Sequence, residues 1–593
     1  MYNNDNNIIN NDIINNNDVL INTCKIELTN EQQYTYNELM NFVSNKNEKE
    51  ILLIGYAGTG KTTLIAKFIN DMIKNKISKK IVMAAPTHKA VNIAKSKLFS
   101  SKEDYEELNE TINIMTIHRL LNYQSYVGIE GEKFFAKGKI DPNWSIYDLV
   151  VVDECSMLSN QIISDIKNEI IKESNLHTKI IYLGDPAQLP PVNQAESKIF
   201  NGNIKTLTLD KIIRTSNQKI MELSNSHRKW TQSKKNEDIP HICEYEDESI
   251  KLYSTENKET KQWLDDFVNI LKSDGNNNKI ITEFDYGIET KSNDYKNEND
   301  NNCIKMTNHI KLIDNYNNNI ILTWTNKKSN IYNQYVREKI FNKKNLSQWE
   351  IGEILIFNDF HKKDIYEEEY NDLDIESKPK KISIRFYTSE QVKLTDIKQI
   401  KYKFKLLKFK INNNLTPELN DKFKKYYKKI NKLINIELDV YEMIVKKIID
   451  INENKKIIPE YTIISIHSNS EKIYNGINEQ IEKNILLLKT SCYKIINNIK
   501  NNDNNVNNVK CNLQSEVEKK INKLYKEYME NVIDCFAELN YGYCITVHKS
   551  QGSTFKNVFV DMNDILNNNN INETSKCLYT SITRSSKSLY LLV

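Results

Sequence analysis

Residues 55–63 read GYAGTGKTT and stand between an apolar, strand-like run at 51–54 and a helix-like run at 64–68. A loop of this kind surrounds a phosphate with backbone N–H groups, and the following helix adds its positive dipole end. A chance glycine-rich turn with a surface lysine is the other interpretation, which the strand–loop–helix context makes the weaker one. The pattern G-x-x-x-x-G-K-[ST] is filled by Gly55, Gly60, Lys61 and Thr62.

This loop predicts a site for a nucleoside triphosphate. Lys61 is a cation for the β- and γ-phosphate oxygens, and the Thr62 hydroxyl can bind Mg²⁺. The residues expected to contact the nucleotide are Gly55, Ala57, Gly58, Thr59, Gly60, Lys61, Thr62 and Thr63.

Two acidic residues follow another strand-like run, DLVVV at 148–152. A carboxylate at the end of such a strand can hold Mg²⁺, and its neighbour can orient and deprotonate an attacking water. We assign Asp153 to the metal and Glu154 to general base catalysis. An acidic pair at a helix N-terminus is the structural alternative, but the phosphate loop earlier in the chain favours catalysis.

The segment GDPAQLPPV (184–192) follows a third apolar run, at 179–183. Gln188 can hydrogen-bond the γ-phosphate and report its loss, while the prolines stiffen the loop. With a further run at 81–85, apolar strands alternate with helical stretches, which predicts a parallel sheet with helices on both faces. Ligands of such sheets bind beyond the carboxyl ends of the strands, where these motifs lie.

A chain of 593 residues is too long for one core and predicts three or four domains. Its net charge of +3 indicates no general attraction to a polyanion, so a nucleic-acid surface would be local. Nine scattered cysteines without a C-x-x-C pair fit free thiols in a reducing compartment. No apolar run reaches the ~18 residues of a membrane span, and residues 1–18 lack a secretory signal. We expect an intracellular, soluble protein of the cytoplasm or nucleus, including that of a virus-infected host cell.

Arginine is rare here, with six among 82 basic residues. Lysine, asparagine and isoleucine are abundant, as in proteins of AT-rich genomes. A remaining arginine is therefore a candidate for a position that needs a planar, permanent charge. Ordinary surface residues are the other interpretation of three of them, Arg228, Arg337 and Arg385. The other three are Arg119, Arg214 and Arg584.

Seven motifs follow one another along the chain: GYAGTGKTT (55–63), APTHKA (85–90), TIHRLL (116–121), VVDECSM (151–157), GDPAQLPPV (184–192), TVHKSQGSTF (546–555) and YTSITRSSKSLYL (579–591). As a set they resemble the superfamily 1 helicases of the RecD/Dda-like, 5′-to-3′ group. The resemblance covers 28–230 and 535–593 well and the middle of the chain poorly. It implies two RecA-like lobes, with ATP in the cleft between them and single-stranded DNA across their top.

The resemblance gives further residues a nucleotide-binding role. Gln32 in LTNEQQ resembles a glutamine that reads adenine, although the neighbouring Gln33 is a competing choice. Arg214 and Arg584 resemble two arginines that reach the γ-phosphate from across the cleft. A guanidinium group stabilises the transferring phosphoryl group there once the lobes close. Gly552 is expected near the nucleotide, and the expected catalytic residues are Lys61, Glu154, Gln188, Arg214 and Arg584.

The same resemblance implies contacts with single-stranded DNA from several motifs. Hydroxyls, imidazoles and a lysine suit phosphate contacts that hold the backbone without reading bases. A lone histidine is more often a satisfied surface or core residue, but these histidines lie within motifs. Trp324 is compatible with stacking near the strand and equally with core packing. The expected DNA contacts are Pro86, Thr87, His88, Thr116, His118, Thr546, His548, Lys549 and Ser550.

The expected fold is α/β, with two RecA-like P-loop NTPase lobes, and a small β-barrel plus a helical region inserted in the second lobe. The barrel is expected at about 346–410 with 461–467 returning to it, and the alternating charges over 411–535 indicate a solvated helical face. A wedge that splits duplex DNA is expected at 128–139. The segments are an Asn-rich disordered tail (1–26), the first lobe (27–230), the first part of the second lobe with a flexible insertion (231–345), the inserted barrel and helical region (346–535), and the rest of the second lobe (536–593).

These observations favour an ATP-dependent DNA helicase or translocase that uses Mg²⁺. We expect a monomer that moves 5′-to-3′ on single-stranded DNA and acts at duplex junctions, with replication or repair proteins as partners. A superfamily 1 RNA translocase is an alternative, because phosphate contacts do not read the 2′-hydroxyl strongly. A replication or repair adaptor with a reduced motor is a second alternative, against which the intact nucleotide motifs argue.

Overall fold

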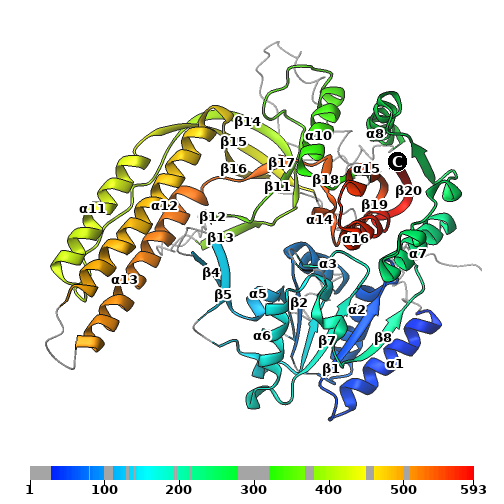
Figure 1. Cartoon of the computed structure of the whole chain (residues 1–593), viewed down its shortest axis with the longest axis horizontal. Helices are drawn as coiled ribbons and strands as arrows, with labels where there is room; N and C mark the ends of the chain where they lie inside the picture. Colours follow the sequence, from blue (N-terminus) through cyan, green and yellow to red (C-terminus); the bar gives the residue numbers. More distant parts are fainter. Residues whose placement is uncertain are drawn as a thin grey trace, which may run out of the picture.

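The computed structural model describes residues 28–78, 80–98, 111–127, 133–138, 141–191, 194, 196–213, 217–277, 319–367, 380–448, 460–499 and 506–593. These residues form two parallel sheets, one antiparallel sheet, two hairpins and a bundle of long helices (Figure 1). The predicted Asn-rich tail and the KSNDYKNENDNN segment of the predicted flexible insertion lie outside the described residues.

The first lobe contains a six-stranded parallel sheet in the order β3-β2-β6-β7-β1-β8. Its strands are rich in Ile, Leu and Val and are buried on both faces, as expected for a parallel sheet. One face is covered by α1 (Asn30–Ser44), α2 (Lys61–Lys74) and α3 (His88–Leu98), and the other by α5 (Ile117–Leu120) and α6 (Asn160–Ile170). The strands are β1 (Glu50–Gly55), β2 (Ile81–Ala85), β3 (Ile112–Thr116), β6 (Leu149–Val152), β7 (Lys179–Gly184) and β8 (Lys205–Leu209).

The second lobe contains a five-stranded parallel sheet in the order β18-β10-β19-β20-β9. One face packs against α7 (Gln218–Ser233), α15 (Met562–Leu566) and α16 (Ile571–Ile582), and the other against α8 (Asn257–Asn277) and α10 (Asn326–Phe341). The two sheets with their helices confirm the predicted pair of RecA-like lobes. The strands are β9 (Ile250–Tyr253), β10 (Asn319–Thr323), β18 (Cys544–Thr546), β19 (Phe555–Asp561) and β20 (Ser585–Leu592).

Two elements of this lobe differ from the sequence-based expectations. Helix α7, placed in the first lobe from the sequence, buries Ile220, Leu223 and Trp230 in the core of the second sheet. The region 231–345, where a flexible insertion was expected, contains β9 and α8 in its described part. Strand β9 has only four residues, too few for a periodic signal. The predicted boundaries between the segments stay predictions.

Between the two parts of the second lobe lies an antiparallel sheet in the order β16-β15-β14-β11-β17. The predicted return of 461–467 is correct, whereas β15 falls in a stretch that we expected to be helical. In its sequence, ELDVYEMIVKK, apolar residues stand both two and three positions apart, as Val440 and Tyr441 do from Leu438, so the pattern fits a strand and a solvated helix face alike. The first and last strands of this order do not pair with each other, so the closed barrel stays a prediction. One bond of 2.7 Å, from the Ala537 N–H just before β17 to the Ile464 carbonyl of β16, lies between them. The strands are β11 (Ile354–Phe357), β14 (Gln391–Lys403), β15 (Glu437–Lys447), β16 (Glu460–Ile466) and β17 (Leu539–Tyr541).

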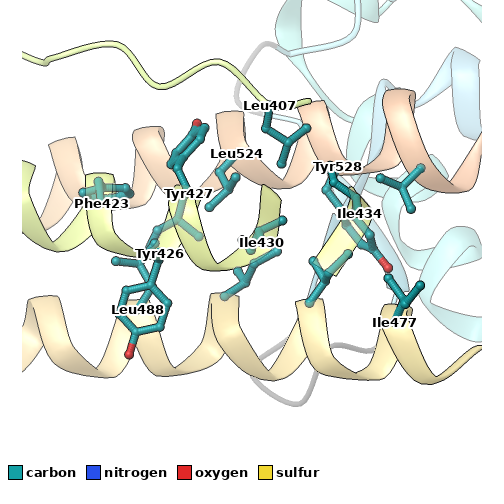
Figure 2. Close-up of a cluster of buried hydrophobic side chains, with 14 of the residues drawn as sticks. Leu407, Phe423, Tyr426, Tyr427, Ile430, Ile434, Ile477, Leu488, Leu524 and Tyr528 are labelled. Carbon is teal, nitrogen blue, oxygen red and sulfur yellow. The ribbon is translucent and has the colours of Figure 1, made fainter. Parts of the chain in front are cut away.

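A three-helix bundle extends from this sheet, away from the lobes on the left of Figure 1. It consists of α11 (Pro417–Ile434), α12 (Ser468–Asn497) and α13 (Val506–Tyr528). Its own hydrophobic core runs between the helices and includes Leu407 of the preceding segment (Figure 2). The bundle therefore has a core separate from those of the lobes.

Two β-hairpins lie on the side of the lobes that faces the bundle in Figure 1. One pairs β4 (Tyr123–Val127) with β5 (Lys133–Lys137), and the other pairs β12 (His361–Glu367) with β13 (Lys380–Phe386). The first falls in the region of the predicted wedge, of which residues 128–132 and 139 lie outside the described part. Across the described ranges, none of the helices combines the length and apolarity needed to span a bilayer.

Candidate nucleotide and DNA sites

The GYAGTGKTT loop connects β1 to α2 at the carboxyl end of the first sheet. Gly60 has φ +80°, a left-handed conformation that favours glycine, and a Cβ on Gly55 would lie 2.3 Å from Lys61 Cγ. The buried Lys61 ammonium donates to the Gly55 carbonyl and, at 3.4 Å, to the Tyr56 carbonyl. Helix α2 begins without a side-chain cap. The loop thus gathers one cation and the uncapped N–H groups of a helix at one place.

The two predicted metal ligands lie together beside this loop. The Thr62 hydroxyl lies close enough to the Asp153 carboxylate, which follows β6, to lower the pKa of that group. Burial raises the pKa of Asp153 well above its usual range, and the neighbouring Glu154 raises it further, whereas Lys61 and Thr62 lower it. A hydroxyl and a carboxylate are hard oxygen ligands of the type that Mg²⁺ prefers, so these residues fit a magnesium ion.

Glu154 has a left-handed backbone conformation, with φ +52°. Its N–H donates to Asp153 Oδ1 at 2.9 Å. A non-glycine residue in this region costs on the order of 1 kcal/mol, and such residues gather at active sites. The strain therefore marks the position that the sequence assigned to the general base.

Gln188 lies in the loop that follows β7. Its Nε2 donates to Asp185 Oδ2 at 3.2 Å. Its buried Oε1 has no hydrogen-bond partner among the described residues. A buried acceptor without a donor costs about 1–3 kcal/mol, so a bound water or another donor would be favourable there.

Tyr579, in α16 of the second lobe, bonds directly to the first lobe. Its hydroxyl accepts from the Ala57 N–H at 3.1 Å and donates to Asp185 at 3.0 Å. The ring is 1% exposed and packs with Tyr56, Ala57 and Ala187. No role was assigned to Tyr579 from the sequence, where its only signal is its place at the head of YTSITRSS. It connects the phosphate loop, the Gln188 loop and the second lobe.

The structure describes one of the two arginines expected at the γ-phosphate, Arg584. Arg584 is buried in the second lobe, where it donates to the carbonyls of Thr580 (3.1 Å) and Ser553 (3.2 Å). Burial lowers its pKa, and the Glu154 carboxylate raises it, which places Arg584 near the catalytic pair. Arg214 lies outside the described residues. The preceding residue, Ile213, donates its N–H to the Gly58 carbonyl of the phosphate loop at 2.7 Å.

Two further arginines are not ordinary surface residues. Arg337 is 2% exposed and forms an ion pair with Glu353, so a surface position is wrong for it. The Arg228 guanidinium lies 4.0 Å from the centre of the Tyr56 ring, beside the phosphate loop. Arg385, in contrast, is exposed.

The structure distinguishes Gln32 from Gln33. Gln32 is buried, and its Nε2 donates to the Thr59 carbonyl of the phosphate loop at 3.0 Å. Gln33 is exposed and bonds to Asn37 within its own helix. Gly552 has φ +77°, and the preceding Gln551 donates to the Leu189 carbonyl across the cleft at 3.3 Å.

The residues expected to contact DNA fall into one group on each lobe. In the first lobe, Pro86, Thr87 and His88 follow β2, while Thr116 ends its neighbour β3 and His118 follows it. The hydroxyls of both threonines accept N–H groups at the start of the following helices. The two strands therefore bring these residues to the same edge of the sheet.

In the second lobe, Thr546 ends β18, and His548, Lys549 and Ser550 follow it. The His548 ring lies 5.2 Å from the half-buried Trp324 ring, which also touches the core of the lobe. Ser550 is fully buried and donates to the Val547 carbonyl, so the structure does not bring it to the surface. Lys549 donates to Asn358 at 2.9 Å.

A stack of rings joins the first lobe to the inserted sheet. The ring centre of His88 lies 4.1 Å from that of Tyr387 and 5.9 Å from that of Phe360. Burial, Arg385 and Lys95 lower the pKa of His88 to about 4. The sequence analysis did not predict that His88 lies beside Phe360, Arg385 and Tyr387. The available signal was the segment RFY (385–387), in which a cation and two aromatic residues stand together.

Comparisons with known proteins agree with this geometry. The model of the AAA domain matches residues 41–194, and that of the UvrD-like helicase C-terminal domain matches 541–592. The uncharacterized protein R530 of Acanthamoeba polyphaga mimivirus is 31% identical over 95% of this chain and 99% of its own length. The ATP-dependent DNA helicase dda of Enterobacteria phage T4 is 30% identical over 29% of this chain and 35% of its own.

Two other proteins have similar sequences or structures. The RecBCD enzyme subunit RecD of Buchnera aphidicola is 36% identical over 24% of this chain and 23% of its own. The crystal structure of the Pif1 helicase from Candida albicans aligns over 96% of this chain and 95% of its own, with 14% identity and a TM-score of 0.33.

The fold and the nucleotide site define a P-loop ATPase with two RecA-like lobes. The nearly full-length match to the mimivirus protein and the RecD and dda matches identify the family. The chain belongs to the superfamily 1 helicases of the RecD/Dda-like group, which are ATP-hydrolysing DNA helicases. The family predicted from the motifs is thereby confirmed.

Proposed function

We propose that this helicase hydrolyses ATP with Mg²⁺ to move 5′-to-3′ along single-stranded DNA and to unwind the duplex ahead. The observation that carries the proposal is the pair of Tyr579 hydrogen bonds. They connect the phosphate loop of one lobe to the lobe that carries the second group of DNA-binding residues. A movement of the phosphate loop on ATP binding or hydrolysis therefore changes the distance between the DNA-binding residues of the first lobe and those of the second.

Each residue of the nucleotide site has a role in this proposal. Lys61 binds the β- and γ-phosphates, and Glu154 accepts a proton from the attacking water, which the unpaired Gln188 Oε1 helps to orient. Thr62 and Asp153 hold Mg²⁺, which neutralises charge on the phosphate oxygens when bound. Arg214 and Arg584 complete the site from the cleft. Gln32 supports the phosphate loop and the adenine side of the site, and Gly552 lies near the nucleotide.

Closure of the lobes would release Arg584 from its bonds to the Thr580 and Ser553 carbonyls. A phosphate group compensates for those lost bonds because its oxygens are negatively charged, whereas the two carbonyl oxygens that Arg584 leaves are neutral. The closed state is thus favoured by ATP, and hydrolysis restores the open state. Translocation also requires the two lobes to differ in DNA affinity between the two states.

The DNA path in this proposal crosses both lobes. His88 and His118 contact the strand from the first lobe, and His548 and Lys549 contact it from the second. The Phe360 and Tyr387 rings beside His88 provide faces on which bases can stack, which is the usual partner of phosphate contacts in single-strand binding. The protein is proposed to act as a monomer at duplex junctions, in replication or repair and with partners from those processes.

Strand displacement tests the proposed direction. We expect duplexes with a 5′ single-stranded tail to be unwound with ATP and Mg²⁺, and duplexes with a 3′ tail to remain paired. The same substrates with an RNA tail should stimulate ATP hydrolysis less. Unwinding from the 3′ tail alone would overturn the direction, and no unwinding from either tail would overturn duplex separation.

Replacing Tyr579 with phenylalanine should uncouple ATP hydrolysis from movement. The ring still fills its site, but the bonds to Ala57 and Asp185 are lost, each worth about 0.5–1.5 kcal/mol. We expect unwinding per ATP hydrolysed to fall roughly 10-fold, since the two bonds together contribute about 1–3 kcal/mol, or roughly 5- to 150-fold. The measurement is the ratio of the strand-displacement rate to the DNA-stimulated ATPase rate.

The matched control is Tyr493→Phe, which removes a hydroxyl bonded to Glu518 in the bundle. That variant should keep the native ratio. A native ratio in Tyr579→Phe as well would show that the hydroxyl does not transmit movement.

A further inference from the structure

Helix α11 of the bundle has two faces of opposite character. Its apolar side chains, among them Phe423, Tyr427 and Ile430, point into the core of the bundle (Figure 2). Its other side carries exposed lysines. These are Lys424, Lys425, Lys428, Lys429 and Lys432.

The charge of this face is not balanced by acidic partners. Helix α11 has six lysines and only two acidic residues, Glu418 and Asp421, both near its start. Within the described part of the chain, no carboxylate forms an ion pair with the five exposed lysines, whereas Lys401 and Lys403 nearby pair with Asp439 and Glu437. The surplus of four charges exceeds the net charge of +3 of the whole chain.

A second element extends the same basic surface. The segment before α11 runs along it, because the side chain of Asn431 bonds to both the N–H (2.8 Å) and the carbonyl (2.9 Å) of Leu407. Lys405 and Lys408 of this segment are exposed. We call the surface formed by these two lysines and the five of α11 the lysine face.

We propose that the lysine face binds the phosphate backbone of double-stranded DNA ahead of the point of strand separation. Lys424 and Lys432 are about 12 Å apart along the helix axis, from a rise of 1.5 Å per residue. Duplex DNA carries one charge per about 1.7 Å, so about seven phosphates lie within that length. The number of lysines per length of helix α11 is therefore similar to the number of phosphates per length of DNA.

The chemistry favours a duplex over a single strand. Single-strand sites combine cations with exposed aromatic rings on which bases stack. The aromatic residues of α11, namely Phe423, Tyr426 and Tyr427, are buried in the bundle instead. A face of lysines without rings suits a backbone whose bases are already stacked and paired. The bundle also lies on the side of the β4–β5 hairpin in Figure 1, where the wedge is predicted.

The solvated face expected from the sequence is the competing interpretation. Mixed charges are typical of solvated helices, and α12 has such a mixture, with Glu471 and Lys472 adjacent and Glu482 next to Lys483. Helix α11 has its two acidic residues in the first five positions and none from Lys422 to its end. The proposal rests on the proposed helicase function only in placing the duplex ahead of the point of strand separation. Binding of the duplex to the lysine face is measured without ATP and does not depend on that function.

The test measures binding of the full-length protein to a short blunt-ended DNA duplex. Fluorescence anisotropy gives the affinity at each of several salt concentrations. The variant replaces five exposed lysines with glutamine, which keeps helix propensity: Lys424→Gln, Lys425→Gln, Lys428→Gln, Lys429→Gln and Lys432→Gln. We expect at least ~10-fold weaker binding at low salt, and a slope of log K against log salt reduced by about 4. Arginine at the same five positions should restore the affinity.

The matched control removes five exposed lysines from the other two helices of the bundle: Lys472→Gln, Lys483→Gln, Lys494→Gln, Lys523→Gln and Lys526→Gln. This variant should bind duplex with close to native affinity. Equal losses in both variants, or none in the α11 variant, would overturn the proposal. DNA-stimulated ATP hydrolysis on single strands should stay native in both, so a failure of the motor and a failure of the lysine face are distinguishable.

Discussion

Replacing Glu154 with glutamine should leave a protein that binds ATP and closes on DNA but hydrolyses ATP roughly 1000-fold more slowly. Glutamine has nearly the same shape, so the strained backbone at this position and the neighbouring residues proposed to hold magnesium are kept. It cannot accept the proton of the attacking water, and general base catalysis contributes about 10²- to 10⁴-fold. Single-turnover ATP hydrolysis and equilibrium binding of a fluorescent ATP analogue measure the two properties separately.

The control for this variant is Glu173→Gln, a change at an exposed glutamate of the same lobe. It should hydrolyse ATP at the native rate. Near-native hydrolysis by Glu154→Gln would assign the general base to another residue, and loss of ATP binding would show that the carboxylate is needed for the site to form.

The second large effect is expected for Lys61→Ala. The ammonium group is the only cation that the phosphate loop itself supplies, and it is held by the Gly55 and Tyr56 carbonyls until phosphate replaces them. Its removal should lower ATP turnover at least ~100-fold, comparable to the loss of one group that stabilises transition-state charge. Unwinding should be abolished with it, because both depend on the same phosphate contacts.

Lys67→Ala is the matched control, since Lys67 lies in the same helix and pairs with Asp71 instead of facing the loop. Binding of single-stranded DNA without nucleotide should be native in both variants. If Lys61→Ala still unwinds DNA with ATP, the phosphate loop is not the nucleotide site that drives the motor.

The features that the sequence predicted correctly are local patterns. The phosphate loop comes directly after β1, and Asp153 with Glu154 comes directly after β6. Each motif lies within a few residues of its own strand, so periodicity and spacing are sufficient to find it. Gln32 could not be separated from Gln33 in this way. Only the folded position of α1, with one side against the phosphate loop, distinguishes them.

The features that were missed depend on distant parts of the chain. Tyr579 and Ala57 are 522 residues apart, and no local pattern can reveal their bond. The stack of His88 with Tyr387 joins two segments that are similarly remote. Strand β15 was missed because the mixed two- and three-residue spacing of its apolar residues fits a helix as well as a strand, and its pairing with β14 and β16 decides between them. The roles of Arg214 and of the other site residues stay predictions.

The ion pair of Arg337 has a mechanical consequence. Its guanidinium group donates to the Ser347 carbonyl at 2.9 Å, where the chain leaves the second lobe, and stacks 3.9 Å from the ring centre of Tyr541, where the chain comes back. One side chain thus contacts both connections between the second lobe and the insertion. The antiparallel sheet and the bundle are therefore expected to move together as one rigid body. Helix α12 alone is about 45 Å long. A small rotation at the two connections is therefore amplified into a sweep of several ångströms at the far end of that body.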